Sequence, residues 1–257
     1  MCLIAFAWNA HPRWRLLLAA NRDEFHVRPS AALGRWRDLP ILGGRDLEAS
    51  GTWLGITAGG RCSAVTNVRD SHGSQRGASR GLLVSNYLRG EASAAAHARE
   101  LLLSAADYRP FNLLTFDANE AFYLGNLPEP RIQAVAPGVH GLSNADFNTP
   151  WPKSQALMQR VQSWIVADDP TNFAPLFDAL ADEQVAQDAQ LPDTGIGLEL
   201  ERRLSSAFIR GAAYGTRAST VVAIGHDGDG VIVERRFGPY GHYLGEKMLR
   251  VGDMAPS

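Results

Sequence analysis

The sequence predicts an α+β fold in which sheets and helices form layers. Short apolar runs that are typical of strands occupy both ends of the 257-residue chain, and segments with helical periodicity lie in its middle. No internal repeat or low-complexity linker divides the chain. Strands that pair into sheets with helices packed on them give a layered architecture. We therefore expect one domain over residues 1–257, although this pattern alone does not choose among α+β topologies.

The strands are predicted from apolar runs and the turns between them. Residues 2–8 and 14–20 are apolar and flank a short polar turn, which predicts an antiparallel hairpin. Residues 52–57 and 61–68 form a second predicted hairpin that turns at Gly59-Gly60. Further strands are expected at 112–116, 121–125 and 131–135, with a last hairpin of 219–224 and 231–236.

The helices are predicted from leucine and alanine spacing. Residues 82–88 and 91–105 are expected to be helical, and the second of these is rich in alanine. Residues 152–166 and 170–180 are predicted as two more helices. The polar segment 70–80 and the acidic segment 181–201 are expected to be irregular connections.

The composition excludes several classes of function. A net charge of −2 gives no electrostatic basis for a nucleic-acid partner. No apolar run approaches the roughly 18 residues of a membrane span, and the first residues lack the basic start of a secretory signal. Two cysteines are too few for a disulfide framework. We expect a cytoplasmic protein with no nucleic-acid partner and no integral membrane segment.

Cys2 is the candidate nucleophile. Removal of Met1 would leave a thiol and a free α-amine on one residue, and the amine could then accept the thiol proton. The two groups titrate near ~8.5 and ~8, so they are matched for proton exchange close to neutral pH. The alternative is that Cys2 is simply an apolar residue of a buried first strand.

The polar segment Asn21-Arg22-Asp23-Glu24 directly follows the second predicted strand. If strand geometry persists, Asn21 and Asp23 face one way and Arg22 and Glu24 face the other. In a hairpin, the end of the second strand lies beside the start of the first, which brings Asp23 near Cys2. A carboxylate there could orient an α-ammonium, and a nearby Arg22 would favour the thiolate. The alternative is a solvated turn with an ordinary ion pair.

No metal or nucleotide cofactor is predicted. The seven histidines are scattered, and neither His-Glu-x-x-His nor Cys-x-x-Cys spacing occurs. The glycine-rich pieces contain no dinucleotide-binding or phosphate-loop pattern.

Six blocks spread along the chain resemble the NRDE family, also called the transport-and-Golgi-organisation-two family. They are Met-Cys-Leu-Ile at the start, Ala-Ala-Asn-Arg-Asp-Glu at 19–24, Gly-Gly-Arg-Asp-Leu at 43–47, Gly-Thr-Trp-Leu-Gly-Ile at 51–56, Gly-Leu-Ser-Asn at 141–144 with Pro-Trp-Pro-Lys at 150–153, and Tyr-Gly-Thr-Arg at 214–217. That family is similar to the N-terminal nucleophile hydrolases, particularly the cysteine branch with penicillin V acylase and bile salt hydrolase. The resemblance implies a four-layer αββα sandwich with Cys2 as the first residue after methionine loss.

The resemblance also implies roles for individual residues. Asn21 and Asp23 match the asparagine and aspartate of an Arg-Asn-x-Asp segment, whereas its arginine position is Ala20 here. Arg22 is a candidate substitute for this arginine. We expect its side chain to start from the opposite face of the strand.

The remaining candidates come from elsewhere in the chain. Asn144 is the counterpart of an oxyanion donor, Asn67 is a second candidate donor, and Arg217 falls where the branch places an arginine near the nucleophile. Both asparagines could instead be turn residues, and Arg217 a surface residue. Trp53 and His26 are candidate binding residues, with a core role as the alternative for Trp53.

Two functions remain open. In the first, Cys2 cleaves an amide or thioester bond through an acyl-enzyme, with Asn144 and Asn67 stabilising the oxyanion and Asp23 and Arg217 positioning the amine and tuning the thiolate. In the second, the same cleft carries a ligand without catalysis, and the resemblance implies haem, acyl-CoA or lipid. Cys2 or His26 could ligate haem iron. No cofactor is required in the first case, and haem is a carried ligand in the second.

Overall fold

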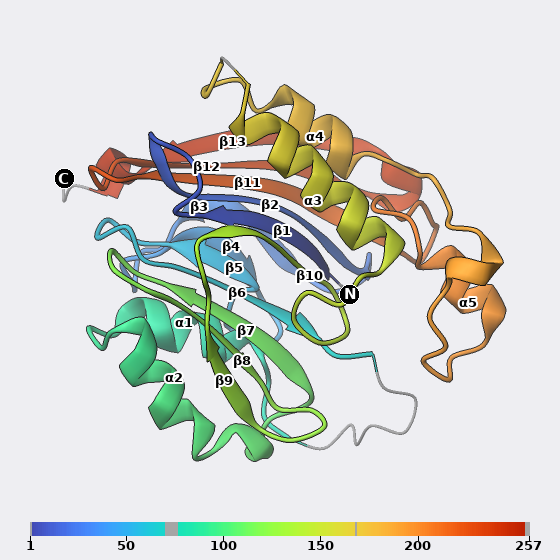
Figure 1. Cartoon of the computed structure of the whole chain (residues 1–257), viewed down its shortest axis with the longest axis horizontal. Coiled ribbons are helices and arrows are strands. Elements are labelled where there is room, and N and C mark those ends of the chain that lie inside the picture. Colours follow the sequence, from blue (N-terminus) through green and yellow to red (C-terminus); the bar gives the residue numbers. More distant parts are fainter. Residues whose placement is uncertain (1, 70–76, 168, 255–257) are drawn as a thin grey trace.

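The computed structural model describes residues 2–69, 77–167 and 169–254 (Figure 1). Two antiparallel sheets stack face to face, and helices cover the outer face of each sheet (Figure 1). The layers follow the order helices, sheet, sheet, helices. The predicted α+β class and the four-layer αββα sandwich are therefore confirmed.

The first sheet contains the N-terminal hairpin as its second and third strands. All of its neighbouring strands pair antiparallel, in the order β10-β1-β2-β11-β12-β13. The strands are β10 (Gly138–Leu142), β1 (Cys2–Trp8), β2 (Trp14–Phe25), β11 (Tyr214–Gly225), β12 (Gly230–Phe237) and β13 (Tyr243–Arg250).

The second sheet is a meander that follows chain order from β3 to β9. Its strands are β3 (Ser30–Arg35), β4 (Leu42–Asp46), β5 (Leu54–Ile56), β6 (Cys62–Asn67), β7 (Phe111–Phe116), β8 (Ala121–Gly125) and β9 (Arg131–Ala134).

Among the described residues, the α-helices form two pairs and one isolated short helix. α1 (Gly81–Arg89) and α2 (Ala94–Leu102) pack on the second sheet, and α3 (Pro152–Ile165) and α4 (Ala174–Leu180) pack on the first. α5 (Leu198–Arg203) lies beside the sandwich (Figure 1). Among the described residues, none of these helices is long and apolar enough to cross a membrane.

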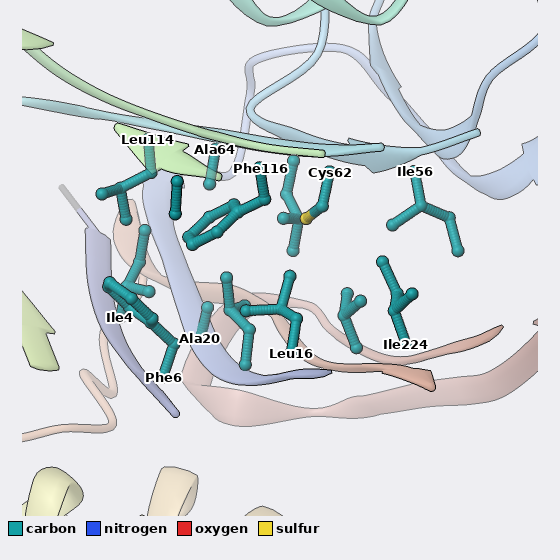
Figure 2. Packing of buried hydrophobic residues seen from close by; sticks show 14 of the residues in the cluster. Ile4, Phe6, Leu16, Ala20, Ile56, Cys62, Ala64, Leu114, Phe116 and Ile224 are labelled. Carbon is teal, nitrogen blue, oxygen red and sulfur yellow. The ribbon is translucent and has the colours of Figure 1, made fainter. Parts of the chain in front are cut away.

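The main core lies between the two sheets. Figure 2 shows Ile4, Phe6 and Leu16 of the first sheet facing Cys62 and Phe116 of the second. Because side chains alternate along a strand, the even-numbered residues of β1 enter this core, whereas Leu3, Ala5 and Ala7 pack against α3 and α4. Cys2, the first described residue of β1, therefore shares the inter-sheet side with Ile4.

Several elements differ from the sequence prediction. The strands β3, β4, β10 and β13 were not predicted, because glycines or charged residues interrupt their apolar pattern. The segment 181–201 contains the start of α5 and is otherwise mostly irregular. Part of the predicted 70–80 loop lies outside the described residues. β2 is longer than predicted and continues to Phe25, so the whole Asn21–Glu24 segment is strand.

Candidate active site

Cys2 opens β1 and lines a pocket between the two sheets. Its residue is 7% exposed, so the thiol is covered but borders the pocket. Burial raises the pKa of the Cys2 thiol, the carboxylates of Asp23 and Glu24 raise it further, and Arg22 lowers it. The thiol is therefore the resting form, and a nucleophilic role requires a group that removes its proton.

Arg22 lies directly across the strand pair from Cys2. Residues paired across two strands place their side chains on the same face, and both residues line the pocket. The expectation that Arg22 starts from the opposite face is wrong, because Ala20 and Arg22 are two residues apart on β2 and share one face. Arg22 extends toward Glu24 at 3.8 Å and Asp46 at 3.6 Å.

Asp23 lies on the helix side of β2 and is 1% exposed. Thr216 Oγ1 donates to its Oδ1 at 2.7 Å. Burial raises the pKa of Asp23, and nearby Lys153 and the Thr216 hydrogen bond lower it. Because Cys2 pairs with Arg22, Asp23 is level with the backbone on the N-terminal side of Cys2. The strand pairing thus gives the predicted proximity of Asp23 to Cys2.

Asn21 is fully buried on the same helix side as Asp23. Its Nδ2 donates to the carbonyl oxygens of Leu180 and Ala207, each at 2.8 Å, and Ser219 Oγ donates to its Oδ1 at 2.6 Å. These bonds join β2 to β11, to the end of α4 and to the segment before β11. Asn21 does not line the Cys2 pocket, and its contacts are those of a structural amide.

Asn67 and Asn144 are brought together near Cys2. Asn144 Nδ2 donates to both the backbone oxygen and Oδ1 of Asn67, each at 3.0 Å. Asn67 ends β6 and lines the pocket, and its own Nδ2 makes one long 3.4 Å bond to Val68. Ser143 Oγ donates to the Cys2 carbonyl at 3.0 Å, which ties this group to the nucleophile. Asn144 therefore orients Asn67, and Asn67 is the better placed donor for a ligand.

Arg217 sits at a β-bulge in β11. Thr216 pairs with Asp23 and Ala218 with Arg22, so Arg217 is the extra residue between them. A bulge re-aims a side chain, and here Arg217 lines the pocket while it donates to the carbonyls of Phe25 and Arg28 and to Ser30. These bonds hold the connection from β2 to β3 against β11.

The two remaining predicted residues differ in position. Trp53 is half-buried, lines the pocket and packs against the inter-sheet core, so the binding and core roles are compatible. His26 lies in the turn after β2 and is not among the pocket-lining residues. Burial and the Arg217 cation lower the pKa of His26, which keeps it neutral at pH 7.

Several charged residues around Cys2 and along its pocket were not singled out from the sequence, among them Lys153, Arg80 and Arg236. Lys153 of α3 is buried close to Asp23, donates to the Leu204 carbonyl at 2.8 Å, and has its pKa lowered by burial from 10.5 to about 8. Arg80 and Arg236 line the pocket. Lys153 belongs to the Pro-Trp-Pro-Lys block, which was a usable signal. Arg236 could be placed only from the strand register, and Arg80 only from the position of the segment that leads into α1.

The pocket combines a thiol, an amide donor, several guanidinium groups and the carboxylates of Glu24, Asp46 and Glu234. A thiol beside an amide donor suits attack on a carbonyl group. Within the described part of the chain, no three His, Cys, Asp or Glu side chains cluster as a metal site.

Comparison with known proteins places the chain in a family. The sequence profile described as Transport and Golgi organisation 2 matches residues 1–239. The human homolog of Transport and Golgi organization protein 2 is 34% identical over 91% of this chain and 92% of its own length, and the mouse homolog is 33% identical over the same shares. The Drosophila melanogaster protein is 26% identical over 87% of this chain and 88% of its own.

A solved structure also shares the fold. The Caenorhabditis elegans ortholog of N-acylethanolamine-hydrolyzing acid amidase superposes with a TM-score of 0.50 at 12% identity, over 86% of this chain and 92% of that chain. At this identity the likeness concerns the fold alone, the four-layer αββα sandwich. The profile match and the two mammalian homologs establish the closer relationship: the chain belongs to the Transport and Golgi organisation 2 family.

Proposed function

We propose that this protein hydrolyses an amide or thioester bond, with Cys2 as the nucleophile after removal of Met1. The observation that carries the proposal is the position of Cys2, which opens an interior strand of the first sheet and borders an inter-sheet pocket beside Arg22 and Asn67. Rigid elements hold this set, since Cys2 is hydrogen-bonded through its carbonyl to Ser143.

The chemistry needs a base because burial raises the pKa of the Cys2 thiol. The α-amine of Cys2 takes the thiol proton as sulfur attacks the carbonyl carbon. When the tetrahedral intermediate collapses, the bond to the leaving amine or thiol breaks, and that group receives the proton from the ammonium. Water then attacks the resulting thioester on Cys2, releases the acid and restores the thiol.

Two polar side chains, one buried and one half-buried, support this sequence of steps. Asp23 is level with the N-terminal side of Cys2, where its carboxylate orients the α-ammonium and favours the charged form. Asn67, held by Asn144, donates to the developing oxyanion from the facing sheet. Arg22 and Arg217 add positive charge at the pocket wall.

A carrier of haem, acyl-CoA or lipid is the competing function. Carriage of haem requires an iron ligand in the same pocket, and Cys2 is available there, whereas His26 is outside the lining residues. Titration with haem separates the two functions, because a carrier gives a Soret shift that is lost in Cys2→Ala, with no turnover of acyl substrates.

The hydrolase is tested by trapping its acyl-enzyme. The purified protein is mixed with an activated acyl thioester, quenched in acid and examined by intact mass spectrometry. We expect one acyl group on Cys2, formed in a burst and removed on standing in buffer. Cys62→Ala is the matched control, since Cys62 is fully buried in the inter-sheet core. Unchanged acylation of Cys2→Ala would contradict the proposal.

A further inference from the structure

Four residues on four adjacent strands form one transverse row along the floor of the pocket. Cys2 pairs with Arg22, Arg22 with Ala218, and Ala218 with Arg236. All four also line the same pocket. Since neighbouring strands lie about 4.8 Å apart, the backbone of Arg236 is three strand spacings, or roughly 14 Å, from that of Cys2.

The two arginines of the row differ in their partners. Arg22 lies within 4 Å of Glu24 and Asp46. Arg236 forms no ion pair with any other described residue, and its Nη2 makes one 3.5 Å bond to the Leu244 carbonyl. The positive charge at the far end of the row is therefore not neutralised by a contacting carboxylate.

The carboxylate on the same strand face as Arg236 is hydrogen-bonded to another group. Glu234, two residues earlier on the same face of β12, accepts the Leu33 backbone N–H at 2.8 Å. Burial raises the pKa of Glu234, while the Leu33 hydrogen bond, Arg236, Arg22 and Lys247 oppose that shift. The Leu33 bond directs the Glu234 carboxylate toward β3, and no ion pair joins it to Arg236 among the described residues.

The part of the row between Arg22 and Arg236 is small and apolar. Ala218 carries only a methyl group there, and Phe237 and Leu244 line the pocket beside Arg236. This arrangement leaves space for an unbranched chain to lie across β11. The end of that chain would meet the Arg236 guanidinium group, which suits a carboxylate or phosphate.

We propose that the pocket takes an elongated acyl compound whose far end carries a carboxylate or phosphate, and that Arg236 recognises this anionic group. The proposal rests on the proposed function in taking the Cys2 sulfur as the reacting atom. The row sets the span between that sulfur and the anion at roughly 10–14 Å, so Arg236 is a specificity-determining residue that selects both charge and length.

Affinity labels test this without requiring turnover. Iodoacetamido-alkanoic acids of increasing chain length alkylate the Cys2 sulfur, with loss of iodide, and are compared with their neutral methyl amides and with phosphonates of equal length. We expect one range of lengths at which an anionic label reacts at least about tenfold faster than its neutral partner, as charge-assisted recognition implies. The preferred head group, carboxylate or phosphonate, identifies the source of the anion.

Variants on β12 make the test specific. Arg236→Gln is expected to abolish the preference for anionic labels while leaving the rate with plain iodoacetamide unchanged. Arg235→Gln is the matched control, because Arg235 is the adjacent residue, faces the opposite side and pairs with Glu246 at 2.7 Å. Ala218→Leu is expected to slow only the longer labels.

Equal rates for anionic and neutral labels at every length would overturn the proposal, as would a preference that survives in Arg236→Gln. Failure of the hydrolase proposal has a different signature. It gives no acyl-enzyme turnover, yet the labels still report on charge and length, because alkylation of Cys2 needs neither a free α-amine nor hydrolysis.

Discussion

Four consecutive residues near the end of β2 face two different environments, because alternate side chains point to opposite sides of the sheet. Arg22 and Glu24 face the pocket, where their charges lie 3.8 Å apart and border space that a ligand can occupy. Asn21 and Asp23 face the helices, where both are buried and hydrogen-bonded. Strand alternation divides one sequence motif between two tasks.

The difference shows how the motif is to be interpreted. On the helix side, Asn21 fixes β2 to its surroundings and Asp23 is held level with the start of β1. On the pocket side, Arg22 sits across from Cys2 and affects its ionisation. Substitutions on the helix side should therefore alter stability first, and substitutions on the pocket side should alter reactivity first.

Asn21→Ala is expected to have the largest effect on stability. It removes two donated bonds and leaves the Leu180 and Ala207 carbonyls and the Ser219 hydroxyl without their partner. We expect the free energy of unfolding to fall by about 3 kcal/mol. Urea denaturation followed by circular dichroism measures this, and a loss below about 1 kcal/mol would show that the helix face is not a closed network.

Lys153→Met tests the buried charge beside Asp23 through its pH dependence. The folded pKa of Lys153 is lowered from 10.5 to about 8, so between these values the unfolded chain binds more protons and stability rises with pH. Relative to Lys153→Met, the wild-type free energy of unfolding should rise by up to about 3 kcal/mol across this window. Urea titrations from pH 7 to 10.5 measure this. If the free energy of unfolding depends on pH in the same way in the two proteins, the burial of a charged lysine is contradicted.

Ser219→Ala probes the same helix-side network with a smaller change. The hydroxyl donates to Asn21 Oδ1 at 2.6 Å, and its loss leaves one buried acceptor without that donor. We expect the free energy of unfolding to fall by about 1–2 kcal/mol, with no change in the rate at which iodoacetamide alkylates Cys2. A slower alkylation would mean that the two faces are coupled.

Arg22→Gln is expected to have the smallest effect on stability and to act on the pocket side. Its ion pairs are long, so the free energy of unfolding should change by less than about 1 kcal/mol. Because Arg22 lowers the pKa of Cys2, the variant should shift the pH profile of Cys2 alkylation to higher pH. Arg235→Gln is the matched control, and an unchanged profile would remove Arg22 from the account.

The sequence predicted the centre of the site better than its edges. The N-terminal hairpin and its polar end follow from local patterns, so the proximity of Cys2 to Arg22 and Asp23 could be inferred. The row that reaches Arg236 depends on the register of β2, β11 and β12, including the bulge at Arg217, which no local pattern contains. Lys153 reaches Asp23 only because α3 packs on the first sheet.

The strands that went unpredicted have a shared physical reason. β10 and β4 contain two glycines each, and β13 carries charged residues on a largely exposed edge. Their strand conformation is imposed by pairing with neighbours rather than by intrinsic preference. In contrast, β1 and β7 are buried along their whole length and were predicted from apolar composition.

The N-terminal nucleophile is the central claim, and the most direct measurement is the intact mass of the purified chain with peptide sequencing of its first residue, before and after alkylation. We predict that Met1 is absent, that Cys2 carries a free α-amine, and that a single alkyl group is added there and is lost in Cys2→Ser. A chain that retains Met1 and still forms the acyl-enzyme, or one that is not alkylated at Cys2, would contradict the account.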